Sequence, residues 1–278
     1  MSKRITLRTE VLLEGLLFPE SPRWHDDKLW FVDMDSHKVL TVDLNGNTET
    51  ILQRSEQISG LGWLPDNRLL VVSMGDNTLL RLDPEGVNVV TDLNKFNTEF
   101  CNDLVVDKKG RAYIGNFGFD YFNGKTFAPT KLILVEPNGA ARVVADNMAF
   151  PNGTVITPDD KTLIIAETFA ARLTAFDITE DGSLTNRRVW ASLRSLAPDG
   201  ICLDAEGGIW VAAPGRGRVV RVLEGGEITH IVKVENDAYA CMLGGPDRKT
   251  LFVATSKHTR NAGRIEFVKV DIPGAGLP

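Results

Sequence analysis

Short apolar runs separated by polar turns recur along almost the whole chain. Four examples are residues 29–32, 69–72, 163–166 and 251–254, each rich in Val, Ile, Leu or Ala and followed or preceded by Asp, Gly, Asn or Pro. Runs of this length, bounded by turn signals and enriched in β-branched residues, predict β-strands. No long stretch carries the 3.6-residue period of an amphipathic helix. The pattern therefore predicts an all-β protein.

The apolar runs fall into six similar units, each with a polar start, a strand, a turn, a second strand, a second turn and a third strand. The units begin at Glu20, Ser59, Asn102, Asn152, Asp199 and Ala240. Their starts are spaced 39, 43, 50, 47 and 41 residues apart, and Pro65, Pro158 and Pro246 fall six residues after three of them. Repeats of roughly 40–50 residues with three or four strands each predict a six-bladed β-propeller. We expect one domain over residues 1–278.

Two segments lie outside the repeat. The run from Ile5 to Leu13 alternates like a strand, and we expect it to complete the last blade and close the ring. The insertion from Phe117 to Thr130 includes Phe119, Tyr121, Phe122 and Phe127. It is too long for a hairpin, so we expect either a lid over one face or an aromatic contact surface.

The first positions of the six units point to a metal site. The innermost strands of a propeller line its central channel, so these residues should ring one mouth. Four of the six are oxygen donors, namely Glu20, Asn102, Asn152 and Asp199. Carboxylates and amide oxygens are ligands of hard divalent cations, Ca²⁺ in particular. Ser59 and Ala240 are small, which suggests an open side where substrate enters.

Each of these residues taken alone has a simpler interpretation, because Asp-Gly and Asn-Gly pairs are common in turns. Four oxygen donors at the same register of a six-fold repeat favour the metal site instead. Two carboxylates facing each other across a narrow channel repel, and a cation relieves that repulsion.

Composition excludes several classes of partner. The net charge of −6 and a pI near 5.3, with scattered Lys and Arg, argue against binding to nucleic acid or to an anionic membrane. The first eight residues carry no apolar signal segment, and no apolar run reaches the ~18 residues of a membrane span. Three scattered cysteines predict no disulfide framework. We expect a cytoplasmic protein acting on a small molecule, and the oligomeric state stays open.

Four motifs resemble the SMP-30/gluconolactonase/luciferin-regenerating enzyme family over nearly the full length. They are residues 18–24 (FPESPRW), Asn102-Asp103, residues 150–153 (FPNG) and residues 198–201 (PDGI). The resemblance implies a six-bladed propeller holding one divalent metal, Ca²⁺ first, with Zn²⁺, Mn²⁺ or Mg²⁺ as alternatives. It implies Glu20, Asn152 and Asp199 as ligands, with Asn102 as a fourth ligand or a substrate contact. The implied activity is lactone hydrolysis.

One residue departs from the family pattern. Sugar-lactonase members carry an Arg two residues before the Asn-Asp pair, where this chain has Phe100. Phe offers an apolar face and no hydrogen-bond donor, so a less polar lactone or ester is an alternative to an aldonolactone. The expected substrate contacts are Asn102, Asp103, Phe100, Ser59 and Phe119.

The expected mechanism has the metal polarising the lactone carbonyl and Asp199 acting as general base toward water. Direct attack by Asp199 is the alternative. Asp103 either orients substrate or caps the turn after Asn102, Glu167 and Asn116 support the ligands, and Arg23 pairs within its own blade. Rival functions are an organophosphate-hydrolysing propeller, a strictosidine-synthase-like propeller without metal, and a binding propeller.

Overall fold

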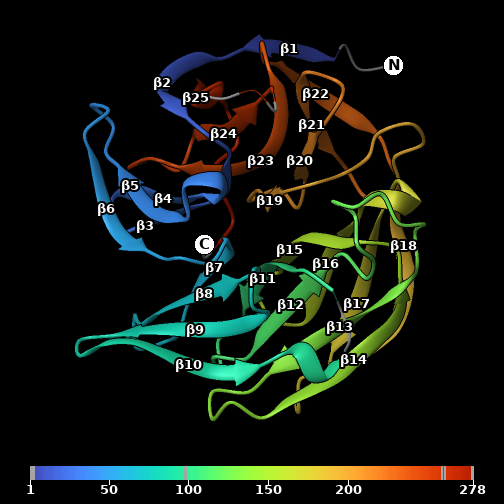
Figure 1. Cartoon of the computed structure of the whole chain (residues 1–278). Helices are drawn as coiled ribbons and strands as arrows, with labels where there is room; N and C mark the ends of the chain where they lie inside the picture. Colours follow the sequence, from blue (N-terminus) through green and yellow to red (C-terminus); the bar gives the residue numbers. More distant parts are fainter. Residues whose placement is uncertain (1–3, 97–98, 258, 260, 277–278) are drawn as a thin grey trace.

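The computed structural model describes residues 4–96, 99–257, 259 and 261–276. Six β-sheets are arranged around a central axis (Figure 1), so the predicted six-bladed propeller is confirmed. We number the blades one to six in chain order. Three short 3-10 helices occur among the described residues, η1 (Met34–Ser36), η2 (Asn94–Phe96) and η3 (Thr168–Ala170), and none has the length or apolarity needed to cross a membrane.

The first three blades each contain four antiparallel strands, innermost strand first. Blade one has β3 (Pro19–His25), β4 (Lys28–Asp33), β5 (Lys38–Val42) and β6 (Thr48–Gln53). Blade two has β7 (Ile58–Trp63), β8 (Leu69–Ser73), β9 (Thr78–Asp83) and β10 (Gly86–Asp92). Blade three has β11 (Cys101–Val106), β12 (Ala112–Asn116), β13 (Thr130–Val135) and β14 (Ala141–Met148).

The last three blades follow the same plan, with additions from the N-terminal region. Blade four has β15 (Pro151–Ile156), β16 (Thr162–Glu167), β17 (Arg172–Ile178) and β18 (Leu184–Ser192). Blade five has β19 (Ile201–Leu203), β20 (Ile209–Ala213), β21 (Arg218–Val222) and β22 (Ile228–Lys233), joined by β1 (Ile5–Arg8). Blade six has β23 (Asp237–Gly244), β24 (Thr250–Ser256) and β25 (Gly263–Lys269), completed by β2 (Glu10–Leu16).

The N-terminal region closes the ring, as predicted, but in two pieces. Strand β2 pairs antiparallel with β25 and becomes the outer strand of blade six. Strand β1 instead pairs parallel with β22, so residues 5–8 extend blade five and not blade six. In Figure 1 the blue N-terminal strands lie beside the orange and red strands of the last two blades. One continuous segment therefore ties two neighbouring blades together.

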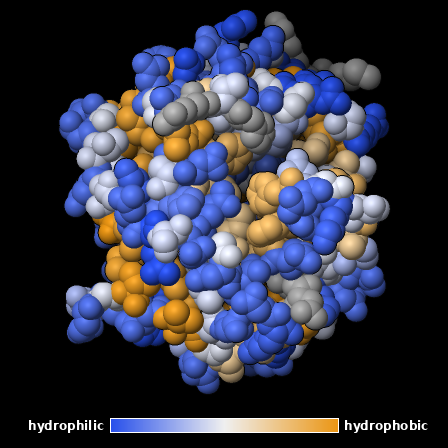
Figure 2. All heavy atoms as spheres, in the orientation of Figure 1, coloured by the Kyte–Doolittle hydropathy of each residue, from blue (hydrophilic) through white to orange (hydrophobic). Residues whose placement is uncertain are grey.

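The hydrophobic core lies between neighbouring blades. The middle strands are almost wholly buried, because side chains on both faces of each inner sheet contact the next blade. Trp24 of blade one stacks on Phe252 of blade six, with ring centroids 5.5 Å apart, at the junction where the ring closes. The outer strands are more exposed, and the face drawn in Figure 2 is largely hydrophilic, interrupted by separate hydrophobic patches.

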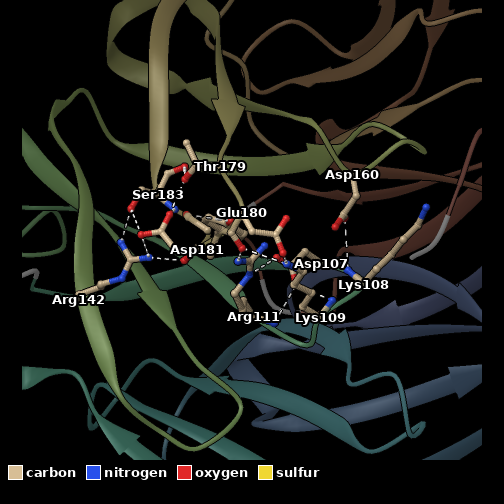
Figure 3. Close-up of polar contacts among 12 residues, drawn as sticks. Asp107, Lys108, Lys109, Arg111, Arg142, Asp160, Thr179, Glu180, Asp181 and Ser183 are labelled. Carbon is tan, nitrogen blue, oxygen red and sulfur yellow. Dashed lines mark hydrogen bonds and ion pairs between the residues drawn. The ribbon is translucent and has the colours of Figure 1, made fainter.

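At one end of the channel, polar turns link blades three and four (Figure 3). The buried Arg111 donates from Nε to Asp107 Oδ2 at 2.5 Å and from Nη1 to the Glu180 carbonyl oxygen at 2.9 Å. Arg142 donates to Ser183 Oγ at 3.0 Å and to the Asp181 carbonyl oxygen at 2.5 Å. We call this set of turns the far-end network, since β11 runs from the predicted metal site to the turn that contains Asp107.

Candidate functional site

The four predicted oxygen donors come together on one cavity. Glu20, Asn102 and Asn152 lie at the starts of the innermost strands β3, β11 and β15, and Asp199 lies just before β19. All four line a cavity of about 550 Å³ at the near end of the channel. In blades one, three and four the pairing of the innermost strand shifts register beside the donor. Such bulges re-aim side chains next to a site, which explains how strand residues can point along the axis.

A chain of hydrogen bonds links three of these donors across blades. Asn102 Nδ2 donates to Asn152 Oδ1 at 2.9 Å, and Asn152 Nδ2 donates to Thr168 Oγ1 at 3.2 Å. The Thr168 hydroxyl donates in turn to the carbonyl oxygen of Pro198, at 2.7 Å, directly before Asp199. Blades three, four and five are thereby held in one arrangement around the cavity floor.

Glycines allow the innermost strands to approach each other closely at this end. A Cβ on Gly153 would lie 2.6 Å from the carbonyl oxygen of Asp199, and a Cβ on Gly200 would lie 2.4 Å from the Cβ of Ala240. Both distances are too short for any side chain. The Asn-Gly and Asp-Gly pairs are therefore sites of close strand packing and not hairpin turns, and this packing brings Asn152 and Asp199 together.

Two buried carboxylates fix the backbone that leads into the donors. Asp33 accepts hydrogen bonds from the backbone N–H of Leu17 at 3.1 Å and of Phe18 at 2.6 Å, just before Glu20. Glu167 accepts from the backbone N–H of Ala149 at 2.8 Å, just before Asn152. Blades one and four thus use the same clamp on the same Phe-Pro turn.

The Phe-Pro turn of blade four is also strained. Phe150 has φ +61°, a left-handed backbone conformation that is uncommon for a bulky residue. The clamp from Glu167 holds this conformation, and Glu167 is itself fixed by Arg172 at 2.8 Å and Arg187 at 3.2 Å. Strain held by surrounding contacts is common at functional sites.

The surroundings disfavour the ionised forms of the two carboxylates at the site. Glu20 and Asp199 are half-buried at the cavity floor. Removal of water raises the pKa of Glu20 well above its usual range, and the charge of Asp199 raises it further. Burial likewise raises the pKa of Asp199 to about 7, although a hydrogen bond from Asn152 acts in the opposite direction. Both groups resist ionisation unless a positive charge joins them.

The cavity supplies no such charge. None of its described lining residues is Lys, Arg or His. Arg23 lies near Glu20 but is bound to Asp103 at 2.6 Å. Among the described residues, no group of three or more His, Cys, Asp or Glu side chains is placed to hold a metal ion, so a cation here would use two carboxylates and two amide oxygens. Asn152 Oδ1 keeps a second lone pair beyond its bond to Asn102, and the donor set fits a hard divalent cation.

Aromatic side chains form one side of the cavity. Phe117, Tyr121 and Phe122 come from the 117–130 insertion, and Phe150 and Phe169 come from blade four. We call these five residues the aromatic wall. The insertion is closed at its base by Asn116, which donates to the Lys131 carbonyl oxygen at 2.6 Å and accepts from the Thr130 hydroxyl at 2.6 Å. Both side-chain hydrogen bonds of Asn116 described here hold the insertion, so Asn116 supports the wall.

Comparison with known proteins agrees with this architecture. A family model described as the SMP-30/Gluconolactonase/LRE-like region matches residues 18–257. The chain belongs to this family. Regucalcin of Xenopus laevis is 30% identical over 258 residues, covering 88% of this chain and 85% of that protein. Pentonolactonase XacC of Haloferax volcanii is 25% identical over 257 residues, covering 89% of this chain and 84% of that protein.

Solved structures of family members share the fold. Regucalcin of Agrobacterium tumefaciens, described as a calcium-binding protein, aligns with a TM-score of 0.85 at 21% identity and covers 99% of both chains. A luciferin-regenerating enzyme aligns with a TM-score of 0.83 at 17% identity, covering 97% of this chain and 98% of that one. At these identities the likeness shows the propeller alone, and the ligand roles of Glu20, Asn102, Asn152 and Asp199 stay predictions.

Four of the expected substrate contacts lie away from the cavity wall or behind it. Ser59 is buried, and its hydroxyl donates to the Asn102 carbonyl oxygen at 2.7 Å, so it positions a donor and opens no entrance. Phe100 packs behind Phe117 and Phe122, with ring centroids 5.8 and 5.1 Å away. Phe119 is buried in the same cluster and does not line the cavity.

Asp103 is the fourth expected substrate contact that does not line the cavity. Its carboxylate accepts from Arg23 Nη2 at 2.6 Å and from the backbone N–H of Leu104 at 2.8 Å, and Asp103 does not line the cavity. Asp103 therefore caps the turn after Asn102, which is one of the two roles expected for it. Arg23 has a structural role, as expected, and donates within blade one to the Pro22 carbonyl oxygen at 3.0 Å, but its ion pair reaches beyond that blade to Asp103 of blade three. Their ion pair crosses the channel below the donors.

Sequence reasoning missed most of the remaining lining residues, although the repeat register contained the signal. Phe18, Gln57, Phe150 and Ala197 each lie two residues before a unit start, and all four line the cavity. Further lining residues directly follow the second strand of a blade: Met34, Asp35, Phe117, Thr168, Phe169, Pro214 and Gly215. Both positions lie at the same end of an antiparallel pair, so extending the register would have found them. Asp237 and Tyr239 of β23 complete the set.

Proposed function

We propose that this protein is a metal-dependent hydrolase that opens a lactone ring. The observation that supports the proposal is the convergence of two carboxylates and two amide side chains on one cavity whose lining has no positive charge. Family relatives carry the names pentonolactonase and lactonase. An ester of similar shape would undergo the same chemistry.

Glu20, Asn152 and Asp199 would hold the cation, and Asn102 would be a fourth ligand or a substrate contact. We expect Ca²⁺, with Zn²⁺, Mn²⁺ or Mg²⁺ as alternatives, because the donors are oxygen atoms and two are neutral amides. A bound divalent cation supplies polarisation of the substrate carbonyl and stabilisation of the negative charge that develops on its oxygen.

Asp199 is the proposed general base. Burial raises its pKa to about 7 in the metal-free protein, and a bound cation would lower that pKa and keep the carboxylate ionised near neutral pH, as a general base requires. Ionised Asp199 would take a proton from the attacking water and later return it to the ring oxygen that leaves. The hydrogen-bond chain from Thr168 to Pro198 fixes the backbone beside Asp199, so the carboxylate is held ready for this transfer.

Metal-dependent turnover tests the proposal. The purified protein is chelated, resupplied with Ca²⁺, Mn²⁺, Zn²⁺ or Mg²⁺, and assayed on a panel of five- and six-membered lactones. We expect hydrolysis to disappear on chelation, to return with metal, and to be lost in Asp199→Ala and Asn152→Ala. Asp247→Ala removes an exposed far-end carboxylate held by Lys269 and is the matched control.

Two results would contradict the proposal. A protein that binds none of these cations, and whose properties do not respond to them, would be a binding or condensing propeller. Metal-dependent hydrolysis of a phosphotriester with no lactone turned over would replace the lactonase with an organophosphate hydrolase.

A further inference from the structure

The aromatic wall is more than a boundary of the cavity, because its ring faces remain accessible. Phe122 is 56% exposed, Tyr121 51% and Phe169 49%. Three of the five wall residues are thus open large apolar groups gathered at one mouth. Exposed apolar surface that is contiguous and sits beside a polar site is typical of a ligand-binding groove.

The wall is built as a rigid unit from two blades. Phe117 stacks on Phe150 with ring centroids 4.3 Å apart, and Phe117 also contacts Phe122 at 5.6 Å. Phe150 contacts Phe169 at 5.4 Å, so the rings continue from the insertion into blade four. Phe150 lies two residues before Asn152, which places this apolar surface directly beside a proposed metal ligand. A group attached to a ring bound at the metal would meet these faces.

The opposite side of the cavity carries negative charge. Asp35 is the second residue of η1 in blade one, and Asp237 is the first residue of β23 in blade six. Neither forms an ion pair with a described residue, and the one hydrogen bond to Asp35 comes from Gln57 Nε2 at 3.3 Å. A divalent cation would balance Glu20 and Asp199 but would leave these two carboxylates uncompensated. An anionic substituent would therefore be repelled from this cavity.

We infer that the substrate is an uncharged lactone carrying an apolar substituent, and that the aromatic wall receives that substituent. This inference rests on the proposed hydrolase function and specifies its substrate class. The aromatic wall supplies the apolar contact, and Asp35 and Asp237 reject substrates that already carry a carboxylate or phosphate. The ring-opened product is itself a carboxylate, so the same charges favour its release.

Matched substrates test the inference with the Ca²⁺-loaded protein. A five-membered lactone with a phenyl substituent is compared with the unsubstituted ring, a carboxylate-substituted ring and a polyhydroxylated ring. We expect kcat/KM for the phenyl lactone to exceed that of the unsubstituted ring by roughly tenfold or more, a common gain for filling an apolar pocket. A maximum for the carboxylated or polyhydroxylated ring would overturn the inference.

Variants then locate the selectivity. Phe122→Ala should lower kcat/KM for the phenyl lactone by about tenfold and should affect the unsubstituted ring less. Phe127→Ala is the matched control, because Phe127 is 40% exposed and stacks on Phe169 at 5.4 Å but does not line the cavity. Equal losses in the two variants would contradict the assignment.

A substitution at Asp237 tests whether negative charge excludes anionic substrates. Asp237→Asn should raise kcat/KM for the carboxylated ring several-fold, as expected for removing one like charge in a partly solvated site, with a smaller change for the phenyl lactone. An unchanged ratio between these two substrates would contradict the role of Asp237.

Binding separates failure of this inference from failure of the proposed function. A phenyl-substituted lactam, which resists hydrolysis, is titrated by calorimetry against its carboxylate-substituted analogue. Preference for the phenyl lactam in a protein that hydrolyses no lactone would retain the apolar pocket and reject the hydrolase. Equal binding or preference for the carboxylate would reject the apolar pocket whatever the activity.

Discussion

Charged side chains are paired at one end of the propeller and lack a cationic partner in the cavity at the other. In the far-end network (Figure 3), Arg111 is buried against Asp107, and their side chains are 5% and 0% exposed. At the near end, Glu20 and Asp199 face a cavity whose described lining has no cation. The same strands connect the two ends, since β11 runs from Asn102 to the turn that contains Asp107.

Under the proposed function, the charges at the far end hold the fold and the carboxylates at the near end bind a cation. A buried ion pair with further hydrogen bonds satisfies both partners and needs nothing else. Buried carboxylates with raised pKa values, set in a cavity, are typical of functional sites. The predictions below test whether the two ends are indeed separable, from the largest expected effect to the smallest.

Replacing the proposed general base should strongly lower the proposed activity without harming the fold. Asp199→Asn is expected to lower kcat by about 10³-fold, within the range for loss of a general base, because an amide cannot take the proton from water. The melting temperature of the metal-free protein should not fall, since the carboxylate that is removed is disfavoured in its ionised form there. Steady-state kinetics and thermal melts check both parts, and a variant that unfolds would contradict the separation.

Breaking the far-end network should do the reverse. Arg111→Met leaves Asp107 buried without its partner and is expected to cost about 3–5 kcal/mol of unfolding free energy, with kcat/KM unchanged where the variant is folded. Arg142→Met is the comparison, because its ion pair with Asp181 is long, at 3.7 Å, and exposed. That change should cost less than about 1 kcal/mol. Denaturant unfolding measures both, and equal costs would refute the distinction.

The stability of the metal-free protein should depend on pH through Asp199. Its folded pKa of about 7 lies above the ~3.9 of an unfolded aspartate, so the folded state binds the extra proton. The resulting stabilisation is complete below ~4 and is lost as pH rises through about 7. In chelator, wild type should therefore lose stability relative to Asp199→Asn between pH 5 and 8. A gap in melting temperature that stays constant over this range would contradict the assignment.

Weakening the backbone clamp should have the smallest effect. Asp33→Asn replaces one of the oxygens that accept from Leu17 and Phe18, so the turn before Glu20 loosens. We expect Ca²⁺ affinity to fall by about 10–100-fold, as is usual for residues that orient metal ligands. Asp43→Asn is the matched control, because Asp43 holds a turn of the same blade at the far end, through the N–H groups of Asn45 and Asn47. Calorimetric titration should show no change there, and equal losses would contradict the clamp.

Local pattern was enough to predict the repeats and the four donors. Strand period, turn residues and unit spacing are set by neighbouring residues, so the six blades and the alignment of Glu20 with Asp199 follow from sequence alone. The division of the N-terminal region into β1 and β2 did not follow from sequence alone, because it depends on which edge strand each piece pairs with.

Strand and turn patterns could not predict the contacts between different blades. The pairing of Arg23 with Asp103 joins blades one and three, and nothing in either repeat specifies it. Ser59 shares the register of the donors, yet a short hydroxyl beside a backbone carbonyl bonds locally and cannot reach the axis. The aromatic wall depends on how the insertion folds back over blade four, which strand periodicity does not describe.

The closure of blade six also sets an order for folding during synthesis. Strand β2 is among the first parts made, but its partner β25 is made after every other strand. Blades one to four can pair internally as they leave the ribosome, whereas β2 must wait with an unpaired edge for most of translation. Non-local pairing of this kind is slow and exposes edges to wrong partners. The ring thus becomes whole only after β25 has emerged, and the proposed metal site, which takes oxygen ligands from blades one and five, should form last.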